Sequence, residues 1–485
     1  MRSILHSAFL LTALAVLATT WTSCSTNPAT GKSQLNLFSE QQEIAMGRQY
    51  AEEVRRSIGL YPDDDLQRYV QRIGSELAAA SERPSLPWSF EVVDDASVNA
   101  FALPGGFIFL TRGIVAHMGS EAEMAGVLGH EIGHVTARHS VNQLSKAQLA
   151  QIGLIGAAVA SPEDFRRFGD LAQAGVSVMF LKFGRDDERQ ADTLGFDYMQ
   201  GAGYPPTALE ELFTMLARVG EGAGSGGRLP SWLSTHPYPE AREQWVSQAS
   251  AGLPESVLQA SWERGPYLRQ VDGIVYGADP REGFFRDAVF YHPGMAFEIA
   301  GPRGWSGINQ KQAVVWQSPR QDALFGLTLA QGRSPRAAAD AFFQQQGIRA
   351  VSGFAGGPRG LDAVATAFET TDPQNPIQGA VTFLAFGDRV FQLVGYSRPA
   401  TWRGVEGEIA RAMASFGPLE SRRDRNVEPM RMTLVTLDRP MTLRDFDRSH
   451  PSSIPLAELA VINHVREDTR LEAGHRVKRV VGGTG

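Results

Sequence analysis

The sequence predicts an α+β protein of several domains, with a mainly helical first domain, a second α+β domain and a small final unit. Its 485 residues suffice for two or three domains of ordinary size. Amphipathic runs of helical period dominate up to about residue 262. Beyond that point, short apolar runs alternate with Gly and Pro turns. A charged stretch at 417–429 reads as a linker, and a last unit follows over 430–481.

The first domain, 24–262, alternates helices with a few strands. Ser39 is a suitable N-cap for the first helix, with Gln42 at the capping-box position. Ser120 and Glu123 repeat this pattern at the start of a later helix. The expected elements are helices over 37–59 and 64–81, a strand over 88–95, two strand segments over 99–115 around Pro104, Gly105 and Gly106, and a mainly helical run from Ser120 to about Gly201.

The second domain, 275–416, is expected to be mostly β-structure with two helices. Apolar runs such as "ALFGLTLA" and "VFQLVGYS" are bounded by turn residues and read as strands. The segments "SPRAAADAFFQQQG" and "ATWRGVEGEIARAMASF" have helical character. Mixed strands and helices in this order indicate an α+β accessory domain.

Charge and hydropathy exclude two classes of protein. The net charge of -7 is mild and no basic patch is present, so nucleic acid is not an expected partner. No stretch reaches the roughly 18 apolar residues of a membrane-spanning helix. The apolar stretch "LAQIGLIGAAVASP" is short and is expected to be a buried helix or a loop over the active site.

The first 23 residues have the layout of a secretory signal: Arg2, then an apolar run, then small and polar residues. The only cysteine, Cys24, follows directly, so no intramolecular disulfide is possible. The segment resembles a bacterial lipoprotein signal, which implies a lipid-modified Cys24, although Trp21 departs from the usual residue. The alternative is a plain signal peptide. Position 25 is Ser, whereas such signals use an aspartate there for retention in the inner membrane. The resemblance therefore favours the periplasmic face of the outer membrane.

The stretch "GVLGHEIGHVTARHS" contains the motif HExxH at residues 130–134. His130 and His134 are four residues apart, so a helix brings them to one face, where two imidazoles can bind one Zn²⁺. Glu131 lies near that face and can reach a water on the metal. The alternative is a helix with polar histidines on its exposed side. His139 lies five residues beyond His134, roughly 140° further around a continuous helix, and is not expected to bind the same ion.

The third ligand has to come from another segment. "GRDDERQADTLGFDYMQ" offers Glu188, with Asp192 one turn later in position to orient a ligating imidazole. Asp186 and Asp187 are rivals for the ligand role, although carboxylates at a helix start often only complement the dipole. Spacing alone leaves the choice open.

Several segments together resemble the zinc metallopeptidases that include the prenyl-protein (CAAX) endopeptidases and the HtpX-like and periplasmic lipoprotein peptidases. The matching segments cover about 27–245: "NPATGKSQLNLFSEQQEIAMG", "NAFALPGGFIFLTRG", "EAEMAGVLGHEIGHVTARHS", "ERQADTLGFDYM" and "STHPYPEAR". The resemblance implies a zincin-like (gluzincin) catalytic domain that binds one Zn²⁺ per chain. In that family the glutamate of an ExxxD motif is the third zinc ligand, which implies that role for Glu188. The aspartate of the same motif corresponds to Asp192.

The later regions resemble known modules less sharply. Residues 275–416 resemble an accessory domain of some lipoprotein members of this family. The segment 430–481 resembles a LysM-like module, which implies peptidoglycan as a partner. Its opening, Arg439 to Leu443, departs from the usual Gly-Asp-Thr-Leu, so a structural cap is an equal alternative.

The sequence therefore predicts a zinc endopeptidase of the bacterial cell envelope, acting on misfolded or unassembled polypeptides. Glu131 is the expected general base. His236, in "STHPYPEAR", is expected to stabilise the oxyanion or to occupy the open metal position as a latch, and the alternative is a solvated loop histidine. Residues 99–106 are either a substrate-binding edge strand or a core hairpin. Rival functions are a lipid-anchored chaperone or scaffold with a latent protease, and a peptidoglycan-binding protein.

Overall fold

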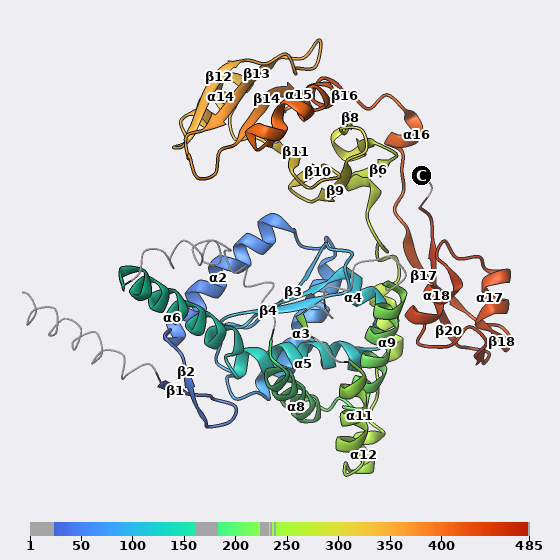
Figure 1. The fold of residues 1–485 in the computed structure, drawn as a ribbon. Helices are drawn as coiled ribbons and strands as arrows, with labels where there is room; N and C mark the ends of the chain where they lie inside the picture. Colours follow the sequence, from blue (N-terminus) through green and yellow to red (C-terminus); the bar gives the residue numbers. More distant parts are fainter. Residues whose placement is uncertain (1–23, 161–182, 224–231, 233–234, 237–238, 484–485) are drawn as a thin grey trace, which may run out of the picture. The chain divides into compact units, whose positions relative to one another are not determined.

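The computed structural model describes residues 24–160, 183–223, 232, 235–236 and 239–483 (Figure 1). It is a mixed α/β protein of two compact units. Unit 1 combines residues up to 277 with residues 431–481, and unit 2 comprises residues 278–430 with the last few residues. The expected signal segment 1–23 lies outside the described residues.

Unit 1 holds the helices and the small sheet that were expected of the first domain. Its elements before unit 2 are β1 (Cys24–Thr26), β2 (Ser33–Leu35), α2 (Glu40–Ser57), α3 (Asp64–Ala79), β3 (Ser89–Val93), β4 (Ala100–Leu103), β5 (Phe107–Thr111), α4 (Arg112–His117), α5 (Glu121–Thr136), α6 (His139–Ala160), α8 (Arg185–Gly201), α9 (Ala208–Ala223), α11 (Pro239–Ser250), α12 (Glu255–Leu258) and α13 (Arg264–Val271). The stretch 149–160 continues α6, and the rest of the apolar segment named above lies outside the described residues. In the described part, no helix is both long and apolar enough to cross a membrane.

The small sheet of unit 1 has the strand order β3-β5-β4. β3 runs parallel to β5, while β4 and β5 form an antiparallel hairpin. Gly105 and Gly106 form the turn of this hairpin, with φ of 78° and 101°. Residues that have a Cβ rarely adopt this backbone region. β4 is therefore an edge strand, while its side chains Phe101 and Leu103 are buried in the core.

The helix starts follow the capping patterns in the sequence. Ser39 and Gln42 form a reciprocal capping box at α2. At α5 the Ser120 hydroxyl accepts from the Glu123 N–H at 3.2 Å, and the Glu123 carboxylate accepts from the Gly119 N–H at 3.0 Å. Local hydrogen bonding thus sets where the motif-bearing helix begins.

Unit 2 is built on a seven-stranded antiparallel sheet of order β12-β13-β14-β15-β11-β10-β9. Its elements are β6 (Phe284–Arg286), β7 (Val289–His292), β8 (Phe297–Ala300), β9 (Ser306–Gln310), β10 (Ala313–Gln317), β11 (Ala323–Leu329), α14 (Pro335–Phe343), β12 (Ile348–Gly353), β13 (Ala363–Thr370), β14 (Gln378–Phe386), β15 (Arg389–Ser397), α15 (Pro399–Ala414), β16 (Gly417–Pro418) and α16 (Arg422–Arg425), with short 3₁₀ turns at Pro280–Glu282 and Pro293–Met295.

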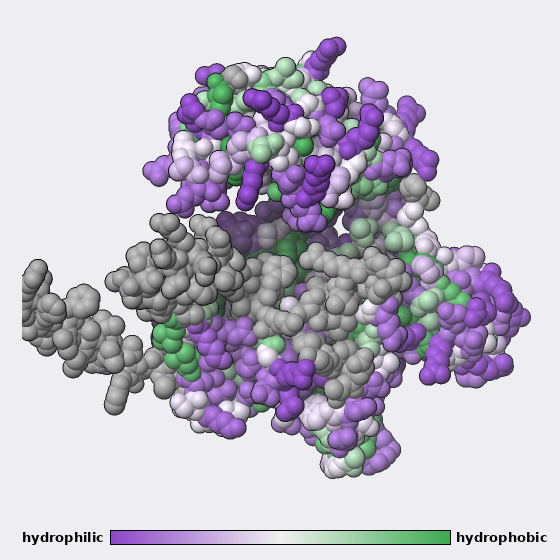
Figure 2. Space-filling view, in the orientation of Figure 1, coloured by the Kyte–Doolittle hydropathy of each residue, from purple (hydrophilic) through white to green (hydrophobic). Residues whose placement is uncertain are grey.

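Helices α14 and α15 of unit 2 cover opposite faces of its large sheet. On β14, Ala380 and Leu384 belong to the apolar cluster that contains α15 residues. Val381 and Phe383 belong to the cluster that contains α14 residues. Alternate residues of a strand point to opposite faces, so one helix packs on each side. Figure 2 shows a mostly hydrophilic visible surface over this unit, with apolar residues scattered among the polar ones.

The segment expected to be a linker, 417–429, has structure of its own within unit 2. β16 pairs with β8, and Asp424 of α16 accepts from Arg286 at 2.7 Å. This charged stretch is ordered because it forms a strand pair and an ion pair with residues more than 100 positions earlier in the sequence. The domain boundaries drawn from the sequence otherwise stay a prediction.

The last segment, 431–481, folds back as part of unit 1. It consists of β17 (Arg431–Thr436), β18 (Met441–Thr442), α17 (Leu443–Ser449), α18 (Leu456–Ile462), β19 (Arg470–Leu471) and β20 (Arg476–Val481). β17 and β20 form an antiparallel pair. The buried Lys478 donates to the carbonyl oxygens of Ala116, at 3.1 Å, and of Met118, so this segment is held at the end of α4.

Candidate metal centre

Helix α5 carries HExxH in the interior of unit 1. All 16 of its residues are buried, including His130, Glu131 and His134. The structural alternative of polar histidines on an exposed helix face is therefore wrong for this helix. Buried polar groups of this kind need partners, and the partners come mainly from α8.

Helices α5 and α8 pack with their backbones in close contact (Figure 1). A Cβ built on Gly195 of α8 would lie 2.8 Å from the backbone nitrogen of His130. A Cβ on Gly129 would lie 3.1 Å from the carbonyl oxygen of Gly195. Glycines at these facing positions let the helices approach closely, which brings the acidic residues of α8 to the histidines of α5.

Four buried residues bring possible ligand atoms together: His130, His134, Glu188 and His236, all within 4.8 Å of one another. The Nε2 atoms of His130 and His134 are 3.0 Å apart. Glu188 Oε1 lies 3.4 Å from His134 Nε2, and Glu188 Oε2 lies 3.6 Å from His130 Nε2. His236 Nδ1 lies 2.9 Å from Glu188 Oε1 and 3.1 Å from His130 Nε2.

The chemistry and spacing of these groups fit a Zn²⁺ ion. Ligand atoms about 2.0–2.1 Å from a tetrahedral ion lie roughly 3.3 Å from each other, close to the spacings above. Glu188 Oε2 is buried without a hydrogen-bond partner in the described part of the chain. Burial, with the charge of Arg242, lowers the pKa of His130 to about 3, so its imidazole is neutral as a metal ligand must be.

The three neighbouring acids at the start of α8 have different environments. The Asp186 side chain is 97% exposed, and that of Glu188 is 4% exposed. Asp187 accepts from the Gly184 N–H at 3.3 Å, as a residue that caps the helix start does. Burial acts to raise the pKa of Glu188, but the neighbouring imidazoles, His236 foremost, hold it below its ordinary value. Of the three, Glu188 is the one that joins the cluster of ligand atoms.

Asp192 lies behind His130, one helical turn after Glu188. Its Oδ1 is 2.9 Å from His130 Nδ1, which leaves Nε2 of that ring facing the cluster. Burial acts to raise the pKa of Asp192, but the Arg242 guanidinium and the hydrogen bond to His130 together hold it below its ordinary value. The carboxylate therefore stays ionised and fixes the orientation of the imidazole.

Arg242 is a site residue to which the sequence reasoning assigned no role. It is buried in α11, donates from Nε to Asp192 at 2.8 Å, and has Nη1 3.5 Å from Glu188 Oε2. Its guanidinium also lies over the Phe213 ring, 4.3 Å from the centroid. The signal that could have found it is the spacing His-Pro-x-x-x-x-Arg, which ends on this arginine.

His236 is buried beside the cluster rather than solvated. Its ring stacks on Trp232, with centroids 4.2 Å apart, and its backbone N–H donates to the Trp232 carbonyl at 2.7 Å. Its Nε2 lies 3.6 Å from Glu131 Oε1. The solvated-loop alternative is therefore wrong, because the ring is enclosed by Trp232 and by the acids of α5 and α8.

Glu131 faces the same space from α5. Burial raises its pKa to about 7. Both of its carboxylate oxygens are buried without a hydrogen-bond partner among the described residues. An acid in this state is ready to accept a proton from a molecule bound at the cluster.

His139 lies where a continuous helix would not have placed it. α5 ends at Thr136, and Arg138 has a φ of 59°, so the chain turns before α6 begins at His139. The premise of one helix was wrong, although His139 is outside the cluster of ligand atoms. Its Nδ1 lies 2.8 Å from His134 Nδ1.

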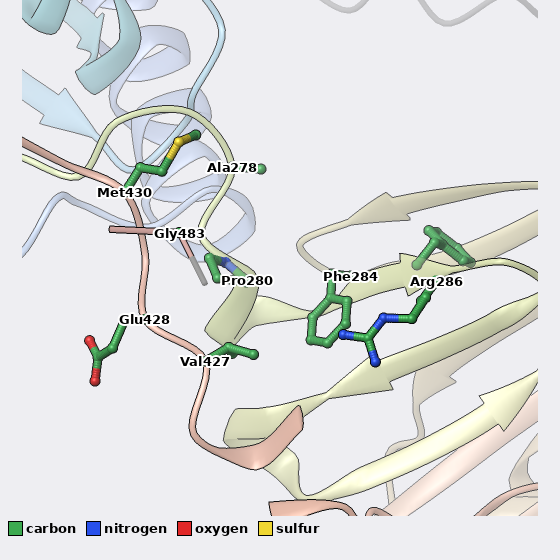
Figure 3. Close-up of a pocket in the computed structure, with 9 residues that line it drawn as sticks. Ala278, Pro280, Phe284, Arg286, Val427, Glu428, Met430 and Gly483 are labelled. Atoms are coloured by element: carbon green, nitrogen blue, oxygen red, sulfur yellow. The ribbon is translucent and has the colours of Figure 1, made fainter. Parts of the chain in front are cut away.

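Other features of the structure lie away from this centre. Cys24 opens β1 and pairs with Leu35 of β2. Unit 2 contains a pocket of about 280 Å³, lined by the side chains of Phe284, Val427 and Met430 among others (Figure 3). None of the site residues expected from the sequence lines this pocket.

Comparisons with known proteins agree with the geometry of the site. Residues 64–249 match the model of a protein family described as "Peptidase family M48". The beta-barrel assembly-enhancing protease of Escherichia coli K12 is 31% identical over 246 residues, which are 49% of this chain and 50% of that protein. The mitochondrial metalloendopeptidase OMA1 of Arabidopsis thaliana is 32% identical over 191 residues, 39% of this chain and 37% of that protein.

Metalloprotease YcaL of Escherichia coli K12 is 32% identical over 164 residues, which are 33% of this chain and 61% of that protein. The chain thus spans about half the length of the first of these relatives. The matched segment runs from α3 to α11 and contains all four residues of the metal cluster. Residues 64–249 of this chain are thus similar to peptidase family M48, whose members are in general zinc-dependent metallopeptidases.

Proposed function

We propose that this protein is a zinc-dependent endopeptidase of the bacterial cell envelope. His130, His134 and Glu188 would hold one Zn²⁺, and the buried cluster of these side chains around a common point carries the proposal. Three protein ligands of this kind leave a further position for water or substrate, as catalytic zinc sites require.

Glu131 is the general base in the proposed reaction. Bound zinc supplies Lewis-acid chemistry, which polarises a peptide carbonyl and lowers the pKa of a water molecule. Glu131 takes the proton of that water and delivers it to the leaving amine. Its burial without a hydrogen-bond partner keeps the carboxylate free for this transfer.

His236 has one of two roles in this proposal. It donates a hydrogen bond to the oxyanion of the tetrahedral intermediate, or it occupies the open metal position as a latch. Its Nδ1 near Glu188 favours the latch in this conformation, and its Nε2 near Glu131 is compatible with the oxyanion role. Loss of activity in His236→Ala with zinc retained supports oxyanion stabilisation, whereas increased basal cleavage supports the latch. Unchanged turnover and zinc content would contradict both.

The proposed substrates are misfolded or unassembled envelope polypeptides. β4 is an edge strand that packs against α5, and its Ala102 backbone lies near Glu131. An extended peptide that pairs with β4 would thus lie beside the base, with affinity from main-chain hydrogen bonds and little demand on side chains. The name of the Escherichia coli relative, a beta-barrel assembly-enhancing protease, supports an envelope role.

Cleavage of casein tests the proposed activity against the alternative of a chaperone or scaffold. The purified protein should bind one zinc and cleave casein, and Glu131→Gln should keep the zinc but lose cleavage. His130→Ala should lose most of the zinc, because two ligands rarely hold it. Normal peptidase rates in Glu131→Gln would refute the mechanism, and absence of cleavage by the zinc-loaded wild type would favour the chaperone.

We also propose that Cys24 carries a lipid anchor on the periplasmic face of a bacterial membrane, with the outer membrane favoured by Ser25. The layout of residues 1–24 supports this location. Cys24→Ser should release the mature protein to the soluble periplasm or stall its processing. Unchanged fractionation and lipid labelling would contradict the anchor. A sacculus pull-down similarly tests peptidoglycan binding by the LysM-like segment.

A further inference from the structure

His139 makes a hydrogen-bond chain that ends at the metal cluster. It is buried, and its ring meets the His134 ring at 71° with centroids 5.0 Å apart. Its Nδ1 lies 2.8 Å from His134 Nδ1, and its Nε2 lies 3.0 Å from Gln190 Oε1. Two imidazole nitrogens at hydrogen-bond distance share one proton, so the other partner of His139 decides which ring donates.

The groups at His139 Nε2 set the direction of this chain. Gln190 presents its carbonyl oxygen, and Asp187 Oδ1 lies 3.7 Å from the same nitrogen. Both are acceptors, so Nε2 carries the proton and Nδ1 of a neutral His139 has a lone pair. The opposite orientation of the Gln190 amide would reverse the chain, but a carboxylate beside this nitrogen favours an N–H there.

It follows that His134 donates from Nδ1 and has its lone pair on Nε2. That nitrogen is the one 3.0 Å from His130 Nε2 and 3.4 Å from Glu188 Oε1. We propose that His139 is the positioning residue of His134, an inference that rests on the proposed zinc site. His139 selects the tautomer of His134 that can bind the metal and fixes the orientation of the His134 ring. Asp192 occupies the same position relative to His130, so one ligand is oriented by a carboxylate and the other by an imidazole.

The turn between α5 and α6 holds His139 in this position. Arg138 adopts a φ of 59°, which sends the following residue back toward the end of α5. The Arg138 guanidinium donates to Glu43 Oε2 at 3.0 Å and to the Phe38 carbonyl at 2.9 Å. Glu43 is itself buried and accepts from Arg83 at 2.9 Å. A buried ion-pair network thus stabilises a backbone conformation that an arginine rarely adopts.

A matched pair of variants tests this role. His139→Asn keeps an acceptor near the place of Nδ1, while His139→Leu has a comparable shape and no acceptor. Competition with a chromophoric chelator measures zinc affinity, and thermal unfolding of the zinc-free proteins measures folding. We expect His139→Leu to lose about 10- to 100-fold in zinc affinity, as for other residues that orient metal ligands. His139→Asn should bind zinc nearly as tightly as the wild type.

Nitrogen-15 NMR of the zinc-free protein supplies a second readout. The coupling pattern of the His134 ring should show the Nδ1–H tautomer in the wild type and in His139→Asn, and a change in His139→Leu. Wild-type zinc affinity in His139→Leu would overturn the inference, as would equal losses of affinity and thermal stability in both variants. An Nε2–H tautomer of His134 in the wild type would also overturn it. If the wild type binds no zinc, the proposed function fails, and the NMR result still decides the direction of the hydrogen bond.

Discussion

Arg242 shows how a single residue makes the acidic side of the centre stable. Glu188 and Asp192 are both buried, and two carboxylates so close together would be costly to ionise in the interior. The guanidinium lies between them and presents a planar fork to Asp192 through Nε and Nη2. One arginine therefore compensates the charge of both acids and leaves the ligand oxygens of Glu188 available.

Replacing this arginine should destabilise the fold. Arg242→Met leaves the buried Asp192 without its cationic partner and should lower the free energy of unfolding by about 3–5 kcal/mol, measured by urea denaturation of the zinc-free protein. Arg189→Met, on an exposed face of α8, is the control and should change it by no more than about 0.5 kcal/mol. Equal stability of the two variants would contradict the role given to Arg242.

At the scale of elements, the contact between α5 and α8 determines whether the ligands meet. The Gly129 and Gly195 backbones are so close that a Cβ on Gly195 would lie 2.8 Å from the backbone nitrogen of His130, and a Cβ on Gly129 would be tightly confined at 3.1 Å from the Gly195 carbonyl oxygen. Any side chain there has to push the helices apart, because the atoms it meets belong to the backbone. The distance from Glu188 to the two histidines depends directly on this packing.

Gly195→Ala should therefore weaken both the fold and the metal site. We expect a loss of about 1–3 kcal/mol in the free energy of unfolding from overpacking, together with lower zinc affinity. The matched control is Gly404→Ala in α15, where a Cβ meets no atom within 4 Å. That change should stabilise its helix by about 0.5–1 kcal/mol and leave zinc binding unaltered. Wild-type zinc affinity in Gly195→Ala would show that the helices tolerate a wider separation.

The element that ties 431–481 to α4 contains a buried lysine whose charge is costly. Burial lowers the pKa of Lys478 to about 7 from an ordinary value of 10.5, although Glu123 opposes this. Between these two values the unfolded chain binds a proton that the folded protein does not, so stability rises with pH across this window. Below about pH 7 the lysine is charged in both states and the cost is fully present.

The dependence can be isolated by comparison with Lys478→Met, which has similar volume and no charge. The free energy of unfolding of the wild type relative to this variant should rise from about pH 7 to 10.5, by at most about 1.4 kcal/mol per pH unit. Urea denaturation at a series of pH values measures it. A difference that stays constant or falls with pH would mean that Lys478 keeps its charge in the folded protein.

At the scale of the whole molecule, the chain leaves unit 1 after residue 277 and returns to it at 431. The two ends are adjacent: the Gly273 N–H donates to the Met432 carbonyl at 2.8 Å, and Met432 donates to Ile274 at 3.0 Å. Residues 278–430 are thus an insertion in unit 1. The unit 1 segments before and after this insertion are hydrogen-bonded to each other. Unit 1 is accordingly expected to fold without the insertion.

Joining 277 to 431 through a short Gly-Ser linker should give a folded protein that binds zinc and cleaves casein. Truncation after residue 430 should instead destabilise unit 1, because it removes Lys478 and the apolar side chains of α18 and β20 from their packing. Circular dichroism, thermal unfolding and zinc content compare the two. A stable, active truncated chain together with an unfolded excised chain would contradict this organisation.

Local patterns determined a large part of this protein from the sequence alone. The capping box at Ser39 and the N-cap Ser120 place two helix starts, since each N-cap side chain accepts from a backbone N–H only three residues ahead. The spacing of His130 and His134 puts both on one helix face for the same reason of short range. Apolar runs in the second domain predicted its central strands, whereas the exposed β9, in which Ile308 is the single large apolar residue, gave no such signal.

Only the tertiary structure decided what depends on contacts between distant segments. Asp186, Asp187 and Glu188 are three neighbouring acidic residues that spacing alone does not distinguish. The packing of α8 on α5 makes Glu188 the buried one. The turn at Arg138, which brings His139 to His134, is held by Glu43 far earlier in the chain. The return of 431–481 to unit 1 likewise depends on contacts between distant segments, among them the hydrogen bond from Lys478 to the Ala116 carbonyl. Spacing along the chain cannot predict such contacts, because each depends on which surfaces the whole fold brings together.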